Sequence, residues 1–329
     1  MMQRIITHND FDGLVSAAIC SHCLNIQYIV FTGPRAVSEA RISITAEDVV
    51  CDLPYPLECG MWFDHHEGNV EELRYRNIDP STLAGRFSVR NSCARVVYEY
   101  FLDHELPSHF SAMVDEADVI DAFAYRSIAD WRTPTPGKII DSAIKLQSED
   151  QEAKRQFLRS LIGLLKERPL DQVCETPSIQ KRYKAFLQEE ERMLERVRQD
   201  ISFLEQDEAH ALIILDLTRH KRRPYVLKHL AYLLHPEALA VLEVKNLFNQ
   251  DVKTNDLALS MSLSLNVAPD QGKDLGDIMR KLNIGSGHPG AAAGQIPCRS
   301  KEEMQKTKTI MLDKIYRMFC SQSSLETRD

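Results

Sequence analysis

Short apolar runs near the N-terminus of this sequence end in side chains that bind divalent metals. Met61-Trp62-Phe63 leads into Asp64-His65-His66, and two other runs end at His8-Asn9-Asp10-Phe11-Asp12 and at Asp52. An apolar run that ends in acids or imidazoles is typical of a buried strand whose tip opens into a site. Carboxylates with neutral imidazoles suit Mn²⁺ and similar ions. Taken alone, Asp64-His65-His66 would also fit a solvated turn.

The spacing of the first two acids favours two ions. Asp10 and Asp12 are two residues apart, so in an extended turn their side chains point in different directions and can serve neighbouring ions. Two ions about 3.5–4 Å apart would clamp the attacking water and the leaving oxygen of a phosphoryl displacement. Four aspartates would nearly balance the formal charge of such a pair. The site could then accept a phosphate that a purely acidic cleft would repel.

Composition excludes several classes of protein. The chain has 329 residues, which suggests two domains, and a formal net charge of −8, so its surface as a whole does not attract nucleic acid or anionic membrane. The eight cysteines are scattered, which argues against a disulfide framework, and Cys20 and Cys23 are expected to pack within a helix. No signal peptide or membrane-spanning run is recognisable. We therefore expect a cytoplasmic protein with no membrane partner.

The elements that must position these residues alternate between strand and helix. Strands are predicted at 4–7, 27–32, 48–54 and 60–63, and helices at about 14–24, 91–102 and 108–124. This order favours a parallel sheet covered on both faces. Ligands of such sheets bind outside the carboxyl ends of the strands, so the three acidic strand exits are expected to meet in one crevice.

The pattern becomes wholly helical from about Asp141, and apolar residues from Ile179 to Leu204 lie on one face of a long charged helix. A second α/β unit follows, with strands predicted at 209–216, 238–244 and 257–265, a helix at 225–234 and a glycine-rich turn from Gly285 to Gly294. The predicted fold class is α/β, with a parallel-sheet domain at 1–145, a helical connector at 146–206 and a smaller α/β domain at 207–329.

Five of these features, in this order, resemble the signatures of the DHH phosphoesterase superfamily. They are His8-x-Asp10-x-Asp12-Gly13, the isolated Asp52, Asp64-His65-His66, Ala117-Asp118-Val119 and the Gly285–Gly294 turn, which is similar to the DHH-associated domain. The superfamily includes single-strand exonucleases, oligoribonucleases, cyclic-dinucleotide phosphodiesterases, exopolyphosphatases and family II pyrophosphatases. The resemblance implies an active site in the cleft between the two domains.

The resemblance also implies a role for each metal-binding position. Asp10, with His8, would hold the first ion. Asp12, His65 and Asp118 would hold the second, with Asp52 bridging both and His66 orienting or protonating the substrate phosphate. Asp121 is the natural replacement if Asp118 is instead a surface acid. The ions implied are two divalent cations, Mn²⁺ first, with Mg²⁺ and Co²⁺ as alternatives.

The glycine turn is expected to bind the far end of the substrate. Its candidate contacts are Gly285, Ser286, Gly287 and His288, because glycines let backbone N–H groups approach an anion closely. A tight packing turn is the alternative. Ser286 takes the place of the third glycine that relatives have, and the segment 260–264 lacks the arginine that relatives often carry. Arg280, Lys281 or the basic run at 219–223 could replace that arginine.

The sequence therefore predicts a metal-dependent phosphoesterase that hydrolyses short oligonucleotides or related small phosphodiesters with a water activated by two metals. An exopolyphosphatase or pyrophosphatase acting on phosphoanhydrides is the alternative within enzymes. A non-catalytic nucleotide-binding regulator is the alternative from another class. The expected partner is a short oligonucleotide or small phosphorylated substrate, with a homodimer left open.

Overall fold

The computed structural model describes residues 2–267 and 272–322, and the chain divides into two compact units. The first unit comprises Met1–Tyr125 and Arg132–Glu189, and the second comprises Arg126–Trp131 and Glu190–Asp329. The boundary falls inside the helix α10 (Pro177–Asp200), which contributes residues to both. The predicted division into a parallel-sheet domain at 1–145, a helical connector at 146–206 and a smaller α/β domain at 207–329 stays a prediction.

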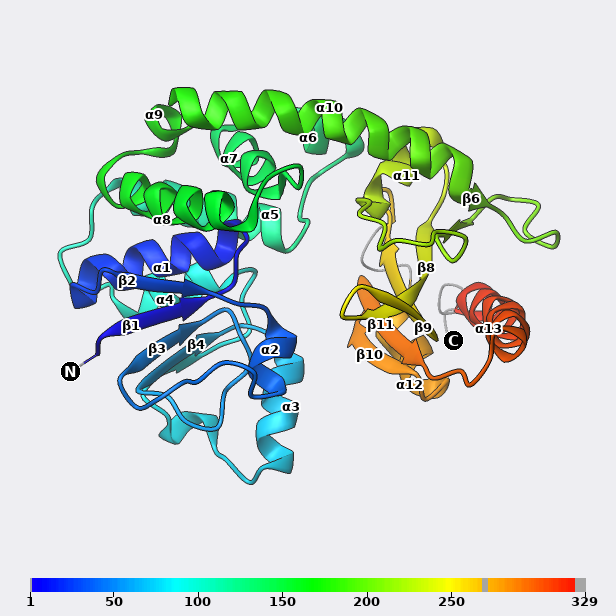
Figure 1. The fold of residues 1–329 in the computed structure, drawn as a ribbon, viewed down its shortest axis with the longest axis horizontal. Coiled ribbons are helices and arrows are strands. Elements are labelled where there is room, and N and C mark those ends of the chain that lie inside the picture. The colour runs from blue at the N-terminus through cyan, green and yellow to red at the C-terminus, as the bar shows by residue number, and fades with distance from the viewer. Residues whose placement is uncertain (1, 268–271, 323–329) are drawn as a thin grey trace, which may run out of the picture. The chain divides into compact units, whose positions relative to one another are not determined.

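Strands and helices alternate along the first unit, and the order agrees with the predicted α/β class (Figure 1). The strands and the short helices between them are β1 (Arg4–Thr7), α1 (Phe11–Leu24), β2 (Tyr28–Phe31), α2 (Pro34–Ser38), β3 (Asp48–Cys51), β4 (Met61–Asp64), α3 (Glu67–Tyr75), η1 (Pro80–Thr82) and β5 (Gly85–Phe87). The helices of this unit that follow are α4 (Cys93–Tyr100), α5 (His109–Asp121), α7 (Pro136–Lys145), α8 (Gln151–Glu167) and α9 (Leu170–Cys174). The short helix α6 (Ile128–Arg132) belongs to the second unit except for its last residue.

The sheet of the first unit is parallel throughout, which confirms the predicted arrangement. Its strand order is β2-β1-β3-β4-β5, and all four pairings are parallel. Thr7 pairs with Cys51, and Cys51 pairs with Phe63, so the exits of β1, β3 and β4 are level with one another. The acids that follow these strands therefore meet at one edge of the sheet.

Successive residues of each strand enter different cores, because side chains alternate across a strand. Ile5 belongs to a large core with α1, α4, α5 and α8, whereas Ile6 belongs to a smaller core with Trp62, Val37 of α2 and Leu73 of α3. Trp62 is held there by an Nε1–H bond to the Leu53 carbonyl at 2.9 Å. Burial on both faces fixes the register of the strands and so fixes the positions of their exits.

The second unit contains one mixed sheet. Its elements are β6 (Ile201–Ser202), β7 (Leu212–Asp216), η2 (Lys228–Leu230), α11 (Ala231–Leu234), β8 (Ala240–Asn249), β9 (Val252–Leu263), α12 (Leu275–Lys281), β10 (Gly285–His288), β11 (Ala291–Ile296) and α13 (Lys301–Ser321). The strand order is β10-β11-β9-β8-β7-β6, and β7 with β8 is its parallel pair. Leu242, Met261 and Ala292 of the sheet form a core with residues of α12 and α13.

Three predicted elements of the second unit differ from the observed ones. The predicted helix at 225–234 is shorter, since only the 3-10 turn η2 and α11 form there, from Lys228 to Leu234. The apolar stripe predicted to continue to Leu204 leaves the helix at Asp200, because Ile201 pairs with Leu215 in the sheet. The Gly285–Gly294 segment is a β-hairpin rather than an irregular turn, since Gly285 pairs with Gly294 and His288 with Ala291. Within residues 2–267 and 272–322, no helix has the length and apolarity needed to cross a membrane.

An ion pair between β1 and β3 is expected to stabilise the first unit. Arg4 donates from Nε and Nη2 to the two carboxylate oxygens of Asp48, at 2.7 and 2.6 Å. Burial alone would raise the pKa of Asp48, but the hydrogen bonds from Arg4 and from the Thr45 amide lower it. Asp48→Asn should therefore reduce the free energy of unfolding at pH 7 by about 1.5–3 kcal/mol.

The pH dependence of this effect follows from the lowered pKa. The stabilisation is complete above the unfolded-state value of about 3.9 and is lost as pH falls through the lower value of the folded state. Urea titrations at pH 7 and at pH 3 should show the difference between the two proteins shrinking in acid. Exposed Asp103 provides the control, because Asp103→Asn should change little at either pH. A difference that grows in acid would contradict this account.

Candidate functional site

Acids and imidazoles from three strand exits form one cluster in the first unit. His8, after β1, places Nδ1 at 3.6 Å from Oδ2 of Asp52, after β3. His65, after β4, places Nε2 at 3.6 Å from Oδ1 of Asp52 and 3.8 Å from Oδ2 of Asp12. Asp121, at the end of α5, lies 3.4 Å from the same His65 nitrogen. The predicted convergence of the strand exits is therefore present.

Backbone contacts fix the two acids that follow β1. Both oxygens of Asp12 accept hydrogen bonds at 2.7 Å from the amides of Cys93 and Ala94, at the start of α4. Asp10 caps α1 by accepting from the Gly13 amide at 3.0 Å, and its other oxygen lies 2.5 Å from His8 Nδ1. Gly13 is required here, because an added Cβ would lie 2.5 Å from the His8 carbonyl oxygen.

The ring of His65 is oriented so that one nitrogen faces the acids. Its Nδ1 lies 3.0 Å from the Arg90 carbonyl oxygen, which can only accept, so the proton of a neutral ring is on Nδ1. The lone pair of Nε2 then points toward Asp12, Asp52 and Asp121. This use of the second nitrogen is usual for histidines that bind metals.

Asp52 has the features of a ligand at the centre of the cluster. Its φ is 57°, in the left-handed region, which costs energy for a residue other than glycine but which aspartate tolerates better than most. Oδ1 of Asp52 and Nε2 of His65 are both buried and have no hydrogen-bond partner within the described part of the chain. Two buried polar atoms that face each other across 3.6 Å leave room for a cation to satisfy both.

The electrostatics of the cluster show an excess of negative charge. Burial raises the pKa of Asp12 well above its usual value, and the nearby Asp52 and Asp121 raise it further. Burial also raises the pKa of Asp121, to about 7, against the opposing effect of His65. Burial would lower the pKa of His65, but Asp52 and the charges of Asp12 and Asp121 raise it to about 10. The pocket therefore favours added positive charge.

Three groups of side chains lie close enough to hold an ion. They are His8, Asp10 and Asp52; Asp12, His65 and Asp121; and Asp52, His65 and His66, and in each the candidate ligand atoms lie within 4.8 Å of one another. Asp52 and His65 each belong to two of the groups. Oxygen and imidazole donors of this kind fit Mn²⁺, Mg²⁺ or a similar divalent ion.

His66 differs from His65 in exposure and in its partner. Its side chain is 52% exposed, and its Nδ1 lies 2.8 Å from Oδ1 of Asp64, which is fully buried. Asn69 donates to the other Asp64 oxygen at 2.6 Å. Burial would lower the pKa of His66, but the Asp64 carboxylate raises it. An exposed, carboxylate-supported imidazole can donate a proton or a hydrogen bond to a bound anion.

The fold is shared with solved structures of low sequence identity. A pGpG-specific phosphodiesterase, PggH from Vibrio cholerae, matches at 20% identity with a TM-score of 0.67, covering 96% of this chain and 99% of its own. The DHH domain of a member of the s1p family of ribosomal proteins matches at 13% identity with a TM-score of 0.60, covering 96% of this chain and 86% of its own. This chain has the DHH fold.

RecJ from Thermus thermophilus, solved with Mn²⁺, matches at 13% identity with a TM-score of 0.50. The match covers 97% of this chain but only 52% of RecJ, so this chain spans about half of the length of RecJ. No protein-family model matches the sequence, and neither does any curated protein.

The sequence predicts Asp118 as a ligand of the second ion, with Asp121 as its replacement, and the structure favours Asp121. Asp118 accepts hydrogen bonds from Ser92 Oγ at 2.6 Å and from Arg95 Nε at 2.8 Å, and it belongs to none of the three groups. Asp121, one turn further along α5, takes the position beside His65. Among the predicted metal ligands, His8, Asp10, Asp12, Asp52 and His65 are brought together, and Asp118 is not.

The hairpin of the second unit presents the other predicted residues. All four residues of β10, Gly285 to His288, are exposed. A Cβ on Gly285 would lie 2.0 Å from the Ala293 carbonyl oxygen, so this glycine lets the two strands pair. His288 Nδ1 accepts from the Gly290 amide at 3.1 Å, which leaves the proton of a neutral ring on Nε2.

Sequence reasoning missed Lys228, which lies on the same face of the sheet as the hairpin side chains. Its Nζ donates to Ser260 Oγ at 2.6 Å, and Ser260 pairs through Ala293 with Ser286. Burial lowers the pKa of Lys228 to about 8, so the amine is still mostly charged at neutral pH. A single lysine next to His229 gave no signal that would have marked it.

Four of the arginines and lysines suggested from sequence have partners in the protein. Arg280 donates to the Gly287 carbonyl at 2.9 Å, and Lys281 pairs with Asp277 at 2.8 Å. Arg219 pairs with Asp200, and Arg223 donates to the Phe248 carbonyl at 3.3 Å. Lys228, whose Nζ donates to Ser260 within that segment, is a further candidate for the role of the arginine absent from 260–264.

The competition between Asp121 and Asp118 can be tested by metal binding. Removing a group that only supports a ligand typically costs about 10–100-fold in affinity, so loss of a direct ligand oxygen should cost at least about 100-fold. We expect Asp121→Asn to weaken Mn²⁺ binding by that factor, measured from the paramagnetic resonance of free Mn²⁺.

Asp118→Asn is the matched control, three residues away on the same helix. It should keep the Mn²⁺ affinity and lower only the free energy of unfolding, because Arg95 loses a partner. A loss of affinity in Asp118→Asn with none in Asp121→Asn would reverse the assignment.

Proposed function

We propose that this protein is a metal-dependent phosphoesterase that hydrolyses short oligonucleotides or related small phosphodiesters. The observation that carries the proposal is the cluster of Asp10, Asp12, Asp52, His65 and Asp121 at the strand exits of a DHH fold. Divalent ions bound there supply the positive charge that holds a phosphate and activates the attacking water. A protein that only binds nucleotides has no need for so many converging ligands.

The residues of the chain divide the remaining work. His8, Asp10 and Asp52 would hold one ion, and Asp12, His65 and Asp121 the other. The two α4 amides hold Asp12, and the Arg90 carbonyl holds His65, so neither ligand has to reorganise when substrate arrives. Preorganised groups of this kind lower the barrier, because they are aimed before charge develops.

His66 and the hairpin face supply contacts to the substrate. His66, supported by Asp64, would donate to the reacting phosphate and fix its orientation. Lys228 and His288 would bind a phosphate or sugar away from the scissile bond. Energy from such remote contacts can position the reacting group. A small number of cationic groups fits a short substrate better than a long single strand, which needs an extended basic groove.

Substitution of Asp52 tests the metal chemistry. Asp52→Asn is nearly isosteric, and asparagine also tolerates a φ of 57°, so the variant should fold. We expect it to abolish hydrolysis in a panel of dinucleotides including pGpG, longer RNA and DNA, cyclic dinucleotides and polyphosphate, with Mn²⁺ present. Circular dichroism and the melting temperature would verify folding.

Asp103→Asn, at an exposed position outside the cluster, is the control and should keep full activity. Hydrolysis that persists in Asp52→Asn, or in the wild type after exhaustive chelation, would exclude the proposed chemistry. A preference for polyphosphate over every phosphodiester would assign the same cluster to phosphoanhydrides.

Lys228 tests the role of the hairpin face. A hydrogen bond to a charged group contributes about 1.5–3 kcal/mol, which corresponds to about 10- to 100-fold in binding. Lys228→Met should therefore raise KM for a 5′-phosphorylated dinucleotide such as pGpG by that factor. It should change KM little for bis(p-nitrophenyl) phosphate, which has no phosphate other than the scissile one.

Lys281→Met makes the same change of charge in the same unit and should leave both substrates unaffected. Equal losses on the two substrates would place Lys228 in the fold or in the chemistry. If KM for the dinucleotide rises in Lys281→Met and not in Lys228→Met, Lys281, which the sequence analysis suggested, would be the residue that replaces the missing arginine.

A further inference from the structure

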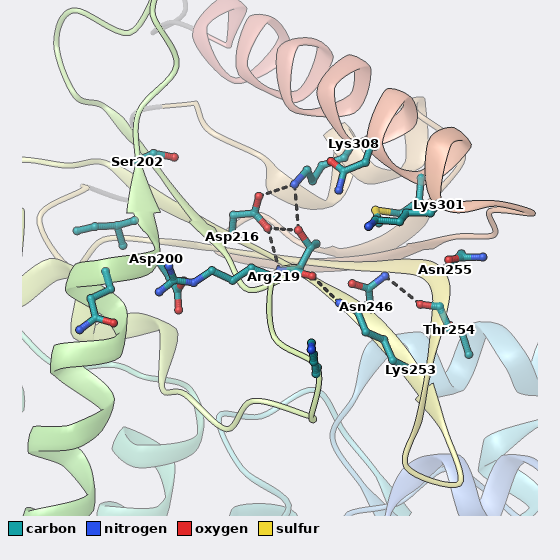
Figure 2. A pocket seen from close by; sticks show the side chains of 16 residues that line it. Asp200, Ser202, Asp216, Arg219, Asn246, Lys253, Thr254, Asn255, Lys301 and Lys308 are labelled. Carbon is teal, nitrogen blue, oxygen red and sulfur yellow. Dashed lines mark hydrogen bonds and ion pairs between the residues drawn. The ribbon is translucent and has the colours of Figure 1, made fainter.

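A pocket of about 700 Å³ lies wholly within the second unit (Figure 2). It is formed where the end of α10 and β6 meet the first turns of α13 and the start of β9. Asp200 lines the pocket from the end of α10 and Ser202 from β6. Lys301 and Lys308 line it from α13, and Lys253 and Asn255 from β9. A volume of this size is ample for a ligand as large as a nucleotide. The metal cluster of the first unit contributes none of the lining residues.

Cationic side chains predominate in the pocket although the chain as a whole has a net charge of −8. Five lining residues are basic and two are acidic: Arg219, Lys221, Lys253, Lys301, Lys308, Asp200 and Asp216. Concentrated positive charge in an acidic protein attracts anions to one place on its surface. The pocket is therefore a candidate site for an anionic ligand.

The two acids of the pocket are already paired. Asp200 forms an ion pair with Arg219 and lies 2.7 Å from His220 Nε2. Asp216 accepts from Lys308 Nζ at 2.5 Å, and Thr218 Oγ1 also donates to it at 2.6 Å. These contacts, drawn in part as dashed lines in Figure 2, compensate the charges of Arg219 and Lys308.

Three lysines are left without a carboxylate partner in the part of the chain that the structure describes. Lys253 donates to the Thr218 carbonyl at 2.5 Å, whereas Lys221 and Lys301 make neither an ion pair nor a side-chain hydrogen bond within residues 2–267 and 272–322. Burial lowers the pKa of Lys253, and the charges of Lys301 and Lys308 lower it further. The lysines thus repel one another, and a bound anion would relieve that repulsion.

Asn246 adds a second requirement to the ligand. It is 4% exposed, and its Nδ2 donates to the Thr254 carbonyl at 3.0 Å. Its Oδ1 is buried and has no hydrogen-bond partner among the described residues. A buried acceptor without a donor costs about 1–3 kcal/mol unless something supplies one. A ligand with a hydroxyl or amino group would satisfy it.

We propose that this pocket binds a small phosphorylated molecule that carries a hydroxyl or amino group, of the nucleoside monophosphate class. The phosphate would be held by Lys253 and Lys301, with Lys221 adding charge at the pocket. A hydroxyl or amino group would donate to Asn246 Oδ1. Such a ligand could be a free nucleotide or the far end of a longer nucleotide substrate, since both present the same chemistry.

Binding of AMP to the full chain by isothermal titration calorimetry, in buffer with a chelator and no divalent ion, tests the proposal. We expect one site per chain and an affinity that falls as salt is raised. The double variant Lys253→Gln/Lys301→Gln should raise the Kd at least tenfold. Lys306→Gln/Lys314→Gln is the matched control, because both lysines are exposed on α13 and outside the pocket.

Comparison of ligands tests the two parts of the site. Adenosine, which lacks the phosphate, should bind at least tenfold more weakly than AMP, and inorganic phosphate, which lacks the sugar and base, should do the same. Equal affinity for adenosine and AMP would overturn the role of the lysines. Equal affinity for phosphate and AMP would overturn the role of Asn246.

The melting temperature without ligand provides a check that does not depend on binding. Removing two lysines that repel each other should leave it unchanged or raise it, and Lys301→Gln alone serves if the double variant does not fold. No AMP binding by the wild type at millimolar concentration would overturn the proposal. So would an unchanged Kd in the pocket variant.

The two sources of the ligand are separated by substrate length. A KM that rises in the pocket variant for a long oligonucleotide but not for a dinucleotide would identify the far end of a substrate. Unchanged KM values together with the loss of AMP binding would identify a free nucleotide.

Discussion

The repulsion among buried carboxylates at the edge of the parallel sheet is the constraint on which the first unit depends. Parallel strands bring His8, Asp52 and His65 level with one another, α4 supplies the amides that bind Asp12, and α5 carries Asp121 to His65. Burial raises the pKa values of Asp12 and Asp121, so the cluster is electrostatically unfavourable as a set of anions. A site of this kind is stable with cations, which is why its donor set points to metal chemistry.

The surrounding structure limits how the cluster can relax. Two α4 amides hold Asp12, the Arg90 carbonyl holds His65, and Gly13 permits the tight turn between β1 and α1. Rotation of the Asp12 or His65 side chain could relieve the repulsion among the carboxylates, but it would break a buried hydrogen bond, and losing a buried hydrogen bond costs more than losing an exposed one. The left-handed backbone of Asp52 is a further local cost that the packed strands on either side maintain.

The second unit combines two kinds of polar surface on one sheet. Lys228, Ser260 and the hairpin side chains share one face, whereas α12 and α13 pack with the apolar residues of the opposite face. The basic pocket uses the start of α13 and of β9, so it is built from different residues than the hairpin face. Within the described residues, Lys221, Lys253 and Lys301 have no carboxylate partner and Asn246 Oδ1 has no donor, and the packing of the unit alone provides no reason for either feature.

The sequence by itself determined the order of strands and helices, the parallel sheet of the first unit and most of the cluster, because these depend on local periodicity and on the shared edge of parallel strands. Only the tertiary structure could choose between Asp118 and Asp121: they lie three residues apart on one helix, and Ser92 and Arg95 occupy the first. Periodicity likewise could not end α10 at Asp200, because the partner of Ile201 is a strand distant in sequence. The contact of Lys228 with Ser260 and the assembly of the basic pocket could not be predicted for the same reason, because their residues come from segments that only folding brings together.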